Sequence, residues 1–143
     1  GLKGTGNENL HITSTGFDEP QALELVKQSR VVIAVHGLEG EDEAVYVGGR
    51  HRKLKTRLIE ALNEAGFKAR EDDSHHSGTF SSNICNRGAS GRGVQLEISK
   101  SLRRTMFESL KRKGRQTRKL AFHRFVAVIR DVLLNTQLKL ISR

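Results

Sequence analysis

The continuous apolar run VVIAV, residues 31–35, is the feature that most constrains how this chain folds. Five apolar residues without a polar interruption indicate a strand covered on both faces, as in the sheet of an α/β protein. The run ends abruptly at His36 and Gly37, so the strand is expected to end there. Burying such a strand requires helices packed against the sheet.

Predicted helices and strands alternate along the rest of the chain. Apolar residues at helical spacing predict a helix that begins at Pro20, which suits the first turn of a helix. The same spacing predicts an amphipathic helix over residues 53–65, which Gly66 ends. Further elements are predicted as strands at 44–49 and 94–99 and as helices from Lys100 and over about 120–134. Residues 67–93 are polar and glycine-rich and predict a long loop. We therefore expect a single α/β domain over residues 1–143.

The positive charge is concentrated at the C-terminal end of the chain. Residues 1–97 hold 12 basic and 14 acidic residues, whereas residues 98–143 hold 13 basic and two acidic ones. The last third therefore carries a net charge of +11, more than the +9 of the whole chain. Such a segment is either a solvated face of terminal helices or a surface that attracts a polyanion, and charge alone does not identify the polyanion.

His36 and Glu97 are the two candidates for chemistry. His36 ends a buried strand, and α/β sheets place ligands at strand ends, so its imidazole could bind zinc or act as a base. A histidine that only bonds to backbone would fit the same position. Glu97 lies in VQLEIS, on the side of the strand opposite Val94, Leu96 and Ile98. It is a general base if that side lines a cleft and a surface residue if it faces water.

Other patterns exclude several classes of protein and site. Cys85 is the only cysteine, so the chain has no intrachain disulfide and suits a reducing compartment. The sequence has neither an apolar run of the roughly 18 residues that span a membrane nor a signal-peptide stretch, so we expect a cytoplasmic protein without membrane association. No Walker or Rossmann glycine motif is present, which disfavours nucleotide binding. The adjacent His75 and His76 form a poor chelating pair, since neighbours on an extended chain point apart.

Several segments in a fixed order resemble the poly-γ-glutamate hydrolase family of phages and Bacillus-type bacteria. They are LHITSTGFDEPQALELV, VVIAVHG, VYVGG and NICNRGASGRGVQLEIS, together with the terminal helix. The resemblance covers roughly residues 10–134. It implies a three-layer α/β/α fold with a mixed sheet, similar to zinc carboxypeptidases, and hydrolysis of the γ-linked amide of polyglutamate.

The resemblance also implies roles for individual residues. The family's zinc is held by two histidines and a glutamate, and His36 matches the third ligand. Glu97 matches the catalytic glutamate, which would accept a proton from a zinc-activated water. Asn86 and Arg87 match residues that face the substrate, where basic side chains pair with its carboxylates. Polyglutamate is a polyanion, so the basic last third of the chain would attract it.

One departure from the family pattern affects the metal site. The other two ligands of the family belong to a motif of the type HGGxIEPGT, which this sequence does not contain. The resemblance therefore implies an N-terminally truncated domain without the first strand, the first helix and two of the three ligands. Since a catalytic zinc needs about three protein ligands, either another chain supplies the missing part or this product is inactive. The lost strand would also leave an exposed sheet edge and poor solubility.

Two other functions compete with the hydrolase interpretation. The pI of 10.2 and the run KRKGRQTRK would suit a nucleic-acid-binding accessory protein of phage origin. One tyrosine and no tryptophan leave little for base stacking, and no recognition motif is present, so nucleic acid is not favoured. The incomplete metal site also allows a structural domain without catalysis. The sequence does not determine the oligomeric state.

Overall fold

The computed structural model describes residues 12–74 and 77–141, which form an α/β fold around a mixed sheet. The four strands are β1 (Ile33–Leu38), β2 (Ala44–Gly48), β3 (Lys68–Glu71) and β4 (Val94–Ser99). Their order across the sheet is β1-β4-β2-β3. β4 pairs in parallel with β1 and antiparallel with β2, and β2 pairs in parallel with β3. The predicted α/β class with a mixed sheet is confirmed.

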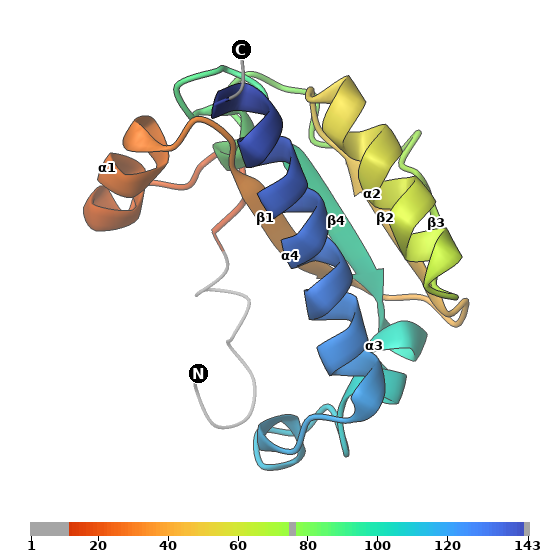
Figure 1. Cartoon of the computed structure of the whole chain (residues 1–143). Helices are drawn as coiled ribbons and strands as arrows, with labels where there is room; N and C mark the ends of the chain where they lie inside the picture. The colour runs from red at the N-terminus through yellow and green to blue at the C-terminus, as the bar shows by residue number, and fades with distance from the viewer. Residues whose placement is uncertain (1–11, 75–76, 142–143) are drawn as a thin grey trace.

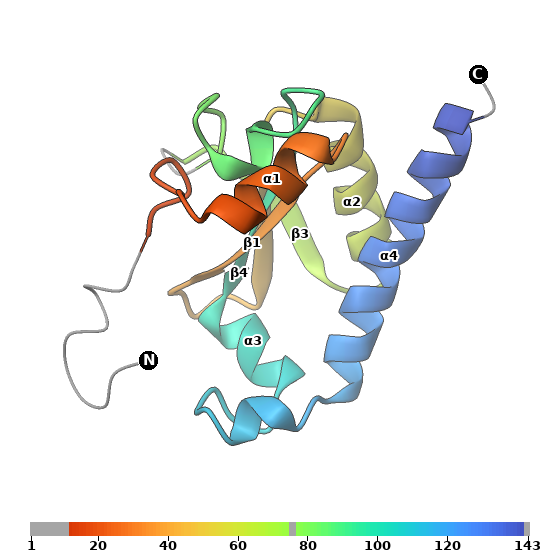
Figure 2. The same ribbon diagram turned by 90° about the vertical axis from the view of Figure 1, so that its left-hand side faces the viewer.

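The helices gather mainly on one face of this sheet. They are α1 (Pro20–Gln28), α2 (Arg52–Glu64), α3 (Lys100–Met106) and α4 (Leu120–Ile141), with short 3₁₀ turns η2 (Ile84–Asn86) and η3 (Gly114–Gln116). Figure 1 shows α2 and α4 side by side in front of the strands, and the turned view in Figure 2 places both on the same side of the sheet. α1 lies beyond the β1 end of the sheet (Figure 1). None of the helices in the described ranges is long and apolar enough to cross a membrane.

The hydrophobic core lies between the sheet and the pair α2 and α4. Leu54, Leu58 and Leu62 repeat at helical spacing along α2 and are at most 1% exposed. They pack with Phe125 of α4 and with alternate residues of the strands. These strand residues are Val45, Val47, Ala69, Val94, Leu96 and Ile98. Alternation along a strand sends the intervening residues to the other face. The face away from α2 and α4 therefore carries the polar side chains of the sheet.

Local signals at the ends of the predicted helices are confirmed. Pro20 opens α1, and the Glu19 carboxylate accepts hydrogen bonds from the amides of Gln21 and Ala22. Gly66 follows α2 with φ of 83°, a conformation that glycine adopts without steric cost. The last helix begins at Leu120 as predicted but continues to Ile141, seven residues beyond the predicted end.

Two predictions for the middle of the chain differ from the structure. The predicted loop 67–93 contains a strand, β3, and the turn η2. β3 has four residues of which only Ala69 is buried, so its sequence lacks an apolar signal, and its pairing with β2 alone defines it as a strand. The helix predicted from Lys100 ends at Met106, because Phe107 turns into an extended bridge with Arg118.

Candidate functional site

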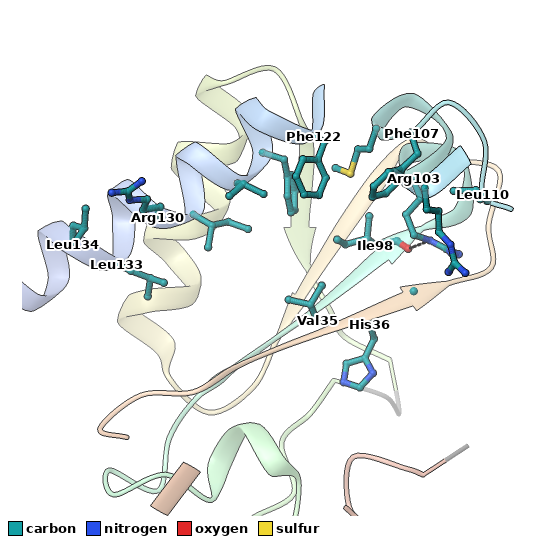
Figure 3. Close-up of a pocket in the computed structure, with 16 residues that line it drawn as sticks. Val35, His36, Ile98, Arg103, Phe107, Leu110, Phe122, Arg130, Leu133 and Leu134 are labelled. Carbon is teal, nitrogen blue, oxygen red and sulfur yellow. Dashed lines mark hydrogen bonds between the residues drawn. The ribbon is translucent and has the colours of Figure 1, made fainter. Parts of the chain in front are cut away.

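His36 and Glu97 lie side by side on the sheet. They occupy the same register position of the parallel pair β1 and β4. The prediction that His36 ends a strand covered on both faces is wrong: β1 continues to Leu38, and Val35 is 59% exposed because β1 lies at the edge of the described sheet. Directly paired residues of neighbouring strands project from the same face. In Figure 3 the ring of His36 points to the opposite side of β1 from Val35, away from the side on which α4 packs. The structure thus brings together the imidazole and the carboxylate that the sequence indicated, on the face without α2 and α4.

The same register extends this pair into a row across all four strands. Tyr46 of β2 pairs with Glu97, and Arg70 of β3 pairs with Tyr46. We call His36, Glu97, Tyr46 and Arg70 the polar row. His36, Glu97 and Tyr46 are half-buried, and Arg70 is exposed. An imidazole, a carboxylate, a phenol and a guanidinium therefore share one line on one face.

Two amide side chains hold the Glu97 carboxylate from one side. The Gln95 amide donates from Nε2 to Glu97 Oε1 at 3.1 Å, and the Asn83 amide donates from Nδ2 to Gln95 Oε1 at 2.9 Å. Gln95 is 4% exposed because the chain at Gly78 packs against it; a Cβ on Gly78 would lie 3.0 Å from the Cβ of Gln95. Since Asn83 engages the oxygen of the Gln95 amide, the nitrogen of that amide is directed to Glu97.

The His36 ring has a hydroxyl partner from the N-terminal part of the chain. Ser14 Oγ lies 2.9 Å from His36 Nε2. The carbonyl of Ser14 in turn accepts a hydrogen bond from the Ile84 amide at 2.8 Å, which ties this segment to η2. The segment around Ser14 therefore connects the polar row to the loop that contains Asn86 and Arg87.

Asn86 and Arg87 lie in that loop, and most of their side-chain contacts are with backbone. Asn86 is 4% exposed; its Oδ1 accepts from the amides of Arg50 and Gly93, and its Nδ2 donates to the carbonyls of Gly78 and Phe80. Arg87 is half-buried and donates from Nη1 to the Phe17 carbonyl at 2.7 Å. In this structure Asn86 holds the loop together, and Arg87 fixes the segment before α1.

The described residues do not by themselves form a zinc site. Within residues 12–74 and 77–141, no three His, Cys, Asp or Glu side chains are grouped so that they could hold a metal ion. A catalytic zinc is held by about three protein ligands, and His36 is the one histidine in the polar row. His11, His75 and His76 lie outside the described residues.

The remaining histidines of the described part and Cys85 have structural surroundings. His51 caps α2, where its Nδ1 accepts a hydrogen bond from the Leu54 amide at 3.3 Å. Burial lowers the pKa of His51, and the nearby Arg92 and Arg57 lower it further. His123 lies in α4 with its ring against Phe122. Burial raises the pKa of the Cys85 thiol to about 11, so it stays protonated at neutral pH.

An apolar groove of about 730 Å³ lies on the α4 side of β1. Figure 3 shows Val35, Ile98 and Phe122 directed toward it, while the His36 ring points away. Arg103 lies at one end, where it donates to the carbonyls of Ile98 and Leu38 at 3.1 Å. Arg115 and Arg130 also line the groove, and none of its lining residues in the described part of the chain is acidic. His36 is among the residues that line the groove, but its ring points to the opposite face of β1, where the polar row lies.

Comparison with known proteins identifies the family. The pattern of the family described as "Poly-gamma-glutamate hydrolase" matches residues 1–128. The chain belongs to this family. Its fold matches a solved bacteriophage poly-γ-glutamate hydrolase with a TM-score of 0.88 at 32% identity, over 93% of this chain and 66% of that one. It also matches a structure described as "YNDL-apo (Zinc-free)" with a TM-score of 0.85 at 39% identity, over 95% and 69% of the two chains.

Curated relatives from Bacillus subtilis are considerably longer than this chain. The UPF0714 protein YmaC is 40% identical over 93% of this chain and 58% of its own length. The UPF0714 protein YndL is 39% identical over 95% of this chain and 55% of its own length. The chain thus spans about half the length of the curated relatives it matches.

The sequence indicates His36 and Glu97 as site residues but does not indicate Tyr46 and Arg70. Tyr46 lies between valines in AVYVG, a pattern that predicts only a strand. Arg70 fell in the predicted loop, because β3 was not predicted. The alternation that turns Tyr46 away from the buried Val45 and Val47 was the available signal for the first of these two residues.

Proposed function

We propose that this chain carries part of the active site of a zinc-dependent hydrolase that cuts the γ-linked amide bonds of poly-γ-glutamate. The observation that carries the proposal is the pairing of His36 with Glu97 on one face of the sheet, in a chain that belongs to the poly-γ-glutamate hydrolase family. A carboxylate beside an imidazole can serve amide hydrolysis, which needs a base for water and an acid for the leaving amine.

Glu97 is the general base in this proposal. Its carboxylate accepts a proton from water, whose oxygen bonds to the amide carbonyl carbon, and then gives the proton to the nitrogen as the C–N bond breaks. The products are a γ-carboxylic acid and an amine. Gln95 donates to one carboxylate oxygen, which orients the group for this transfer.

His36 is the proposed zinc ligand that this chain provides. A neutral imidazole suits zinc, and the solved YndL structure is described as a zinc-free form. The described residues supply too few ligands, so the proposal requires others from outside residues 12–74 and 77–141. In this proposal, the other ligands come from a segment that corresponds to the part of the longer relatives that this chain does not cover.

Substrate carboxylates would meet basic side chains of the chain. Arg87 keeps N–H donors beyond the one bonded to Phe17 and is the proposed partner of a polymer carboxylate, while Asn86 holds the loop that presents it. The last third of the chain, with its net charge of +11, would attract the polyanion at longer range.

A hybrid protein tests the reaction. This chain would replace the matched two thirds of the bacteriophage hydrolase, and the molar mass of poly-γ-glutamate would be followed by size-exclusion chromatography. We expect the polymer to shorten, and we expect a chelator to stop the reaction. The variant Glu97→Gln should lower the rate at least about 100-fold, the usual effect of removing a general base, with an unchanged circular dichroism spectrum.

The controls separate the base from the fold. Glu60→Gln alters an exposed carboxylate of α2, away from the polar row, and should leave the rate within about twofold, as expected for a surface change. Full activity of Glu97→Gln would remove Glu97 from the mechanism. A folded hybrid that leaves the polymer intact with zinc present would contradict the proposed function.

A further inference from the structure

Arg70 lies at the end of the polar row, on the same face as Glu97. The two residues are separated by one strand, β2, so their backbones lie two strand spacings apart, about 10 Å. Arg70 is exposed, and its guanidinium stacks on the Tyr46 ring at 4.6 Å from the ring centre. The long arginine side chain therefore stands beside the space above Tyr46 and Glu97.

The donors of Arg70 are only partly used within the described chain. Nη2 donates to Tyr46 Oη at 2.6 Å and to Asp42 Oδ2 at 3.0 Å, while Nε and Nη1 donate to no residue of the described ranges. A guanidinium has five N–H groups, which leaves three for a ligand. The Tyr46 hydroxyl accepts from Arg70 and still has its own hydrogen to donate.

The partner of Arg70 is an exchangeable carboxylate. The Arg70 and Asp42 side chains are 49% and 61% exposed, and ion pairs this open to solvent contribute little stability. Asp42 thus shows that a carboxylate fits against this guanidinium. Because the Arg70–Asp42 ion pair contributes little stability, a ligand carboxylate can replace Asp42 at little cost in free energy.

We propose that Arg70 and Tyr46 form a binding subsite for an α-carboxylate of the γ-linked polymer, next to the amide bond whose hydrolysis Glu97 would assist as general base. This inference rests on the proposed function. Each repeat of poly-γ-glutamate carries one free α-carboxylate beside its backbone, so a polymer lying along the polar row would present such a group to β3. The subsite gives specificity, because a γ-linked chain without α-carboxylates would lose this contact.

Binding of a fluorescent γ-linked glutamate oligomer to the chain, measured by anisotropy, tests the subsite without turnover. Arg70→Met should weaken binding about tenfold, the loss of one charge-assisted contact. Tyr46→Phe should weaken it less, and Asp42→Asn should tighten it because the competing carboxylate is gone. Arg118→Met removes the same charge from the basic third and should change the dissociation constant less than about twofold.

The outcomes separate this subsite from general charge attraction and from the proposed reaction. Equal weakening by Arg70→Met and Arg118→Met would overturn the subsite, as would undetectable binding by the unchanged chain at low salt. In the hybrid hydrolase, Arg70→Met should raise KM more than it lowers kcat. A hybrid that is folded but inactive would contradict the hydrolase proposal. The subsite would still be tested separately, by the difference in oligomer binding between Arg70→Met and Arg118→Met.

Discussion

Glu97 and His36 are each positioned by a polar neighbour rather than by packing alone. The Glu97 carboxylate receives the Gln95 amide, which the buried Asn83 orients, and the His36 ring meets the Ser14 hydroxyl. Side chains held in this way lose little freedom when a substrate binds. The Asn83 amide and the Ser14 hydroxyl come from two segments far apart in sequence, and both segments contact η2. The geometry of His36 and Glu97 therefore depends on the folded loop around η2.

His51 makes the stability of the fold sensitive to acid. Its lowered pKa means that the folded protein binds this proton less readily than the unfolded chain. As the pH falls below about 6.5, the unfolded state gains the proton first, and the free energy of unfolding decreases. The variant His51→Asn keeps a side-chain acceptor for the start of α2 but does not titrate.

Thermal unfolding at about pH 7.5 and pH 5 measures this contribution. The unchanged chain should lose more stability between the two values than His51→Asn does. His123→Asn, at an exposed position of α4, serves as the control and should lose as much as the unchanged chain. Equal losses by the unchanged chain and His51→Asn would show that His51 does not cause the acid sensitivity.

The loop around η2 depends on Asn86. Its side-chain amide accepts hydrogen bonds from two backbone amides and donates to two backbone carbonyls, and it is 4% exposed. Asn86→Ala should therefore lower the free energy of unfolding by about 2–4 kcal/mol, since buried groups left unpaired cost about 1–3 kcal/mol each. Urea unfolding measures the change. Ser82→Ala, at an exposed position of the same loop, should stay within about 0.5 kcal/mol. A similarly small effect of Asn86→Ala would mean that the loop is held by other contacts.

The helices and three of the four strands could be predicted because their signals are local. Helical spacing of leucines marks α2, and Pro20 marks the start of α1. An apolar run marks β1, and the alternation of apolar and polar residues in VQLEIS marks β4. β3 could not be predicted, since KARE has one buried residue and no apolar alternation. Asn63 of α2 exchanges hydrogen bonds with the backbone of Ala69, and Lys55 pairs with Glu71. These contacts exist only after α2 has packed on the sheet.

At the scale of the whole molecule, the sequence predicts individual site residues but not how the sheet brings them together. His36 and Glu97 were indicated by their strands and by the family resemblance, and the register places them together. The polar row was not predictable, because the order β1-β4-β2-β3 follows from long-range pairing. That order brings Arg70 and Tyr46 beside Glu97, although the family resemblance implies a role for neither.

The two edges of the described sheet differ in how they are protected. β3 has four residues, three of them charged and exposed. β1 has six residues, and among the described strands it pairs with β4 alone. Its Val35 is 59% exposed beside the apolar groove. Charged side chains on an edge strand disfavour its pairing with another chain, whereas an exposed apolar edge strand favours such pairing.

We therefore expect this chain to self-associate through β1 as its concentration rises. Val35→Glu should reduce the association, because it places a charge on the edge next to Arg103 and Arg130 of the groove, which would stabilise a carboxylate. Light scattering after size-exclusion chromatography measures the mean mass at several concentrations. Leu25→Glu is the matched control, since Leu25 is 68% exposed on α1 and does not line the groove. The control should associate like the unchanged chain. Association that both substitutions reduce equally would point to general surface hydrophobicity, and a chain that stays monomeric would contradict an open edge at β1.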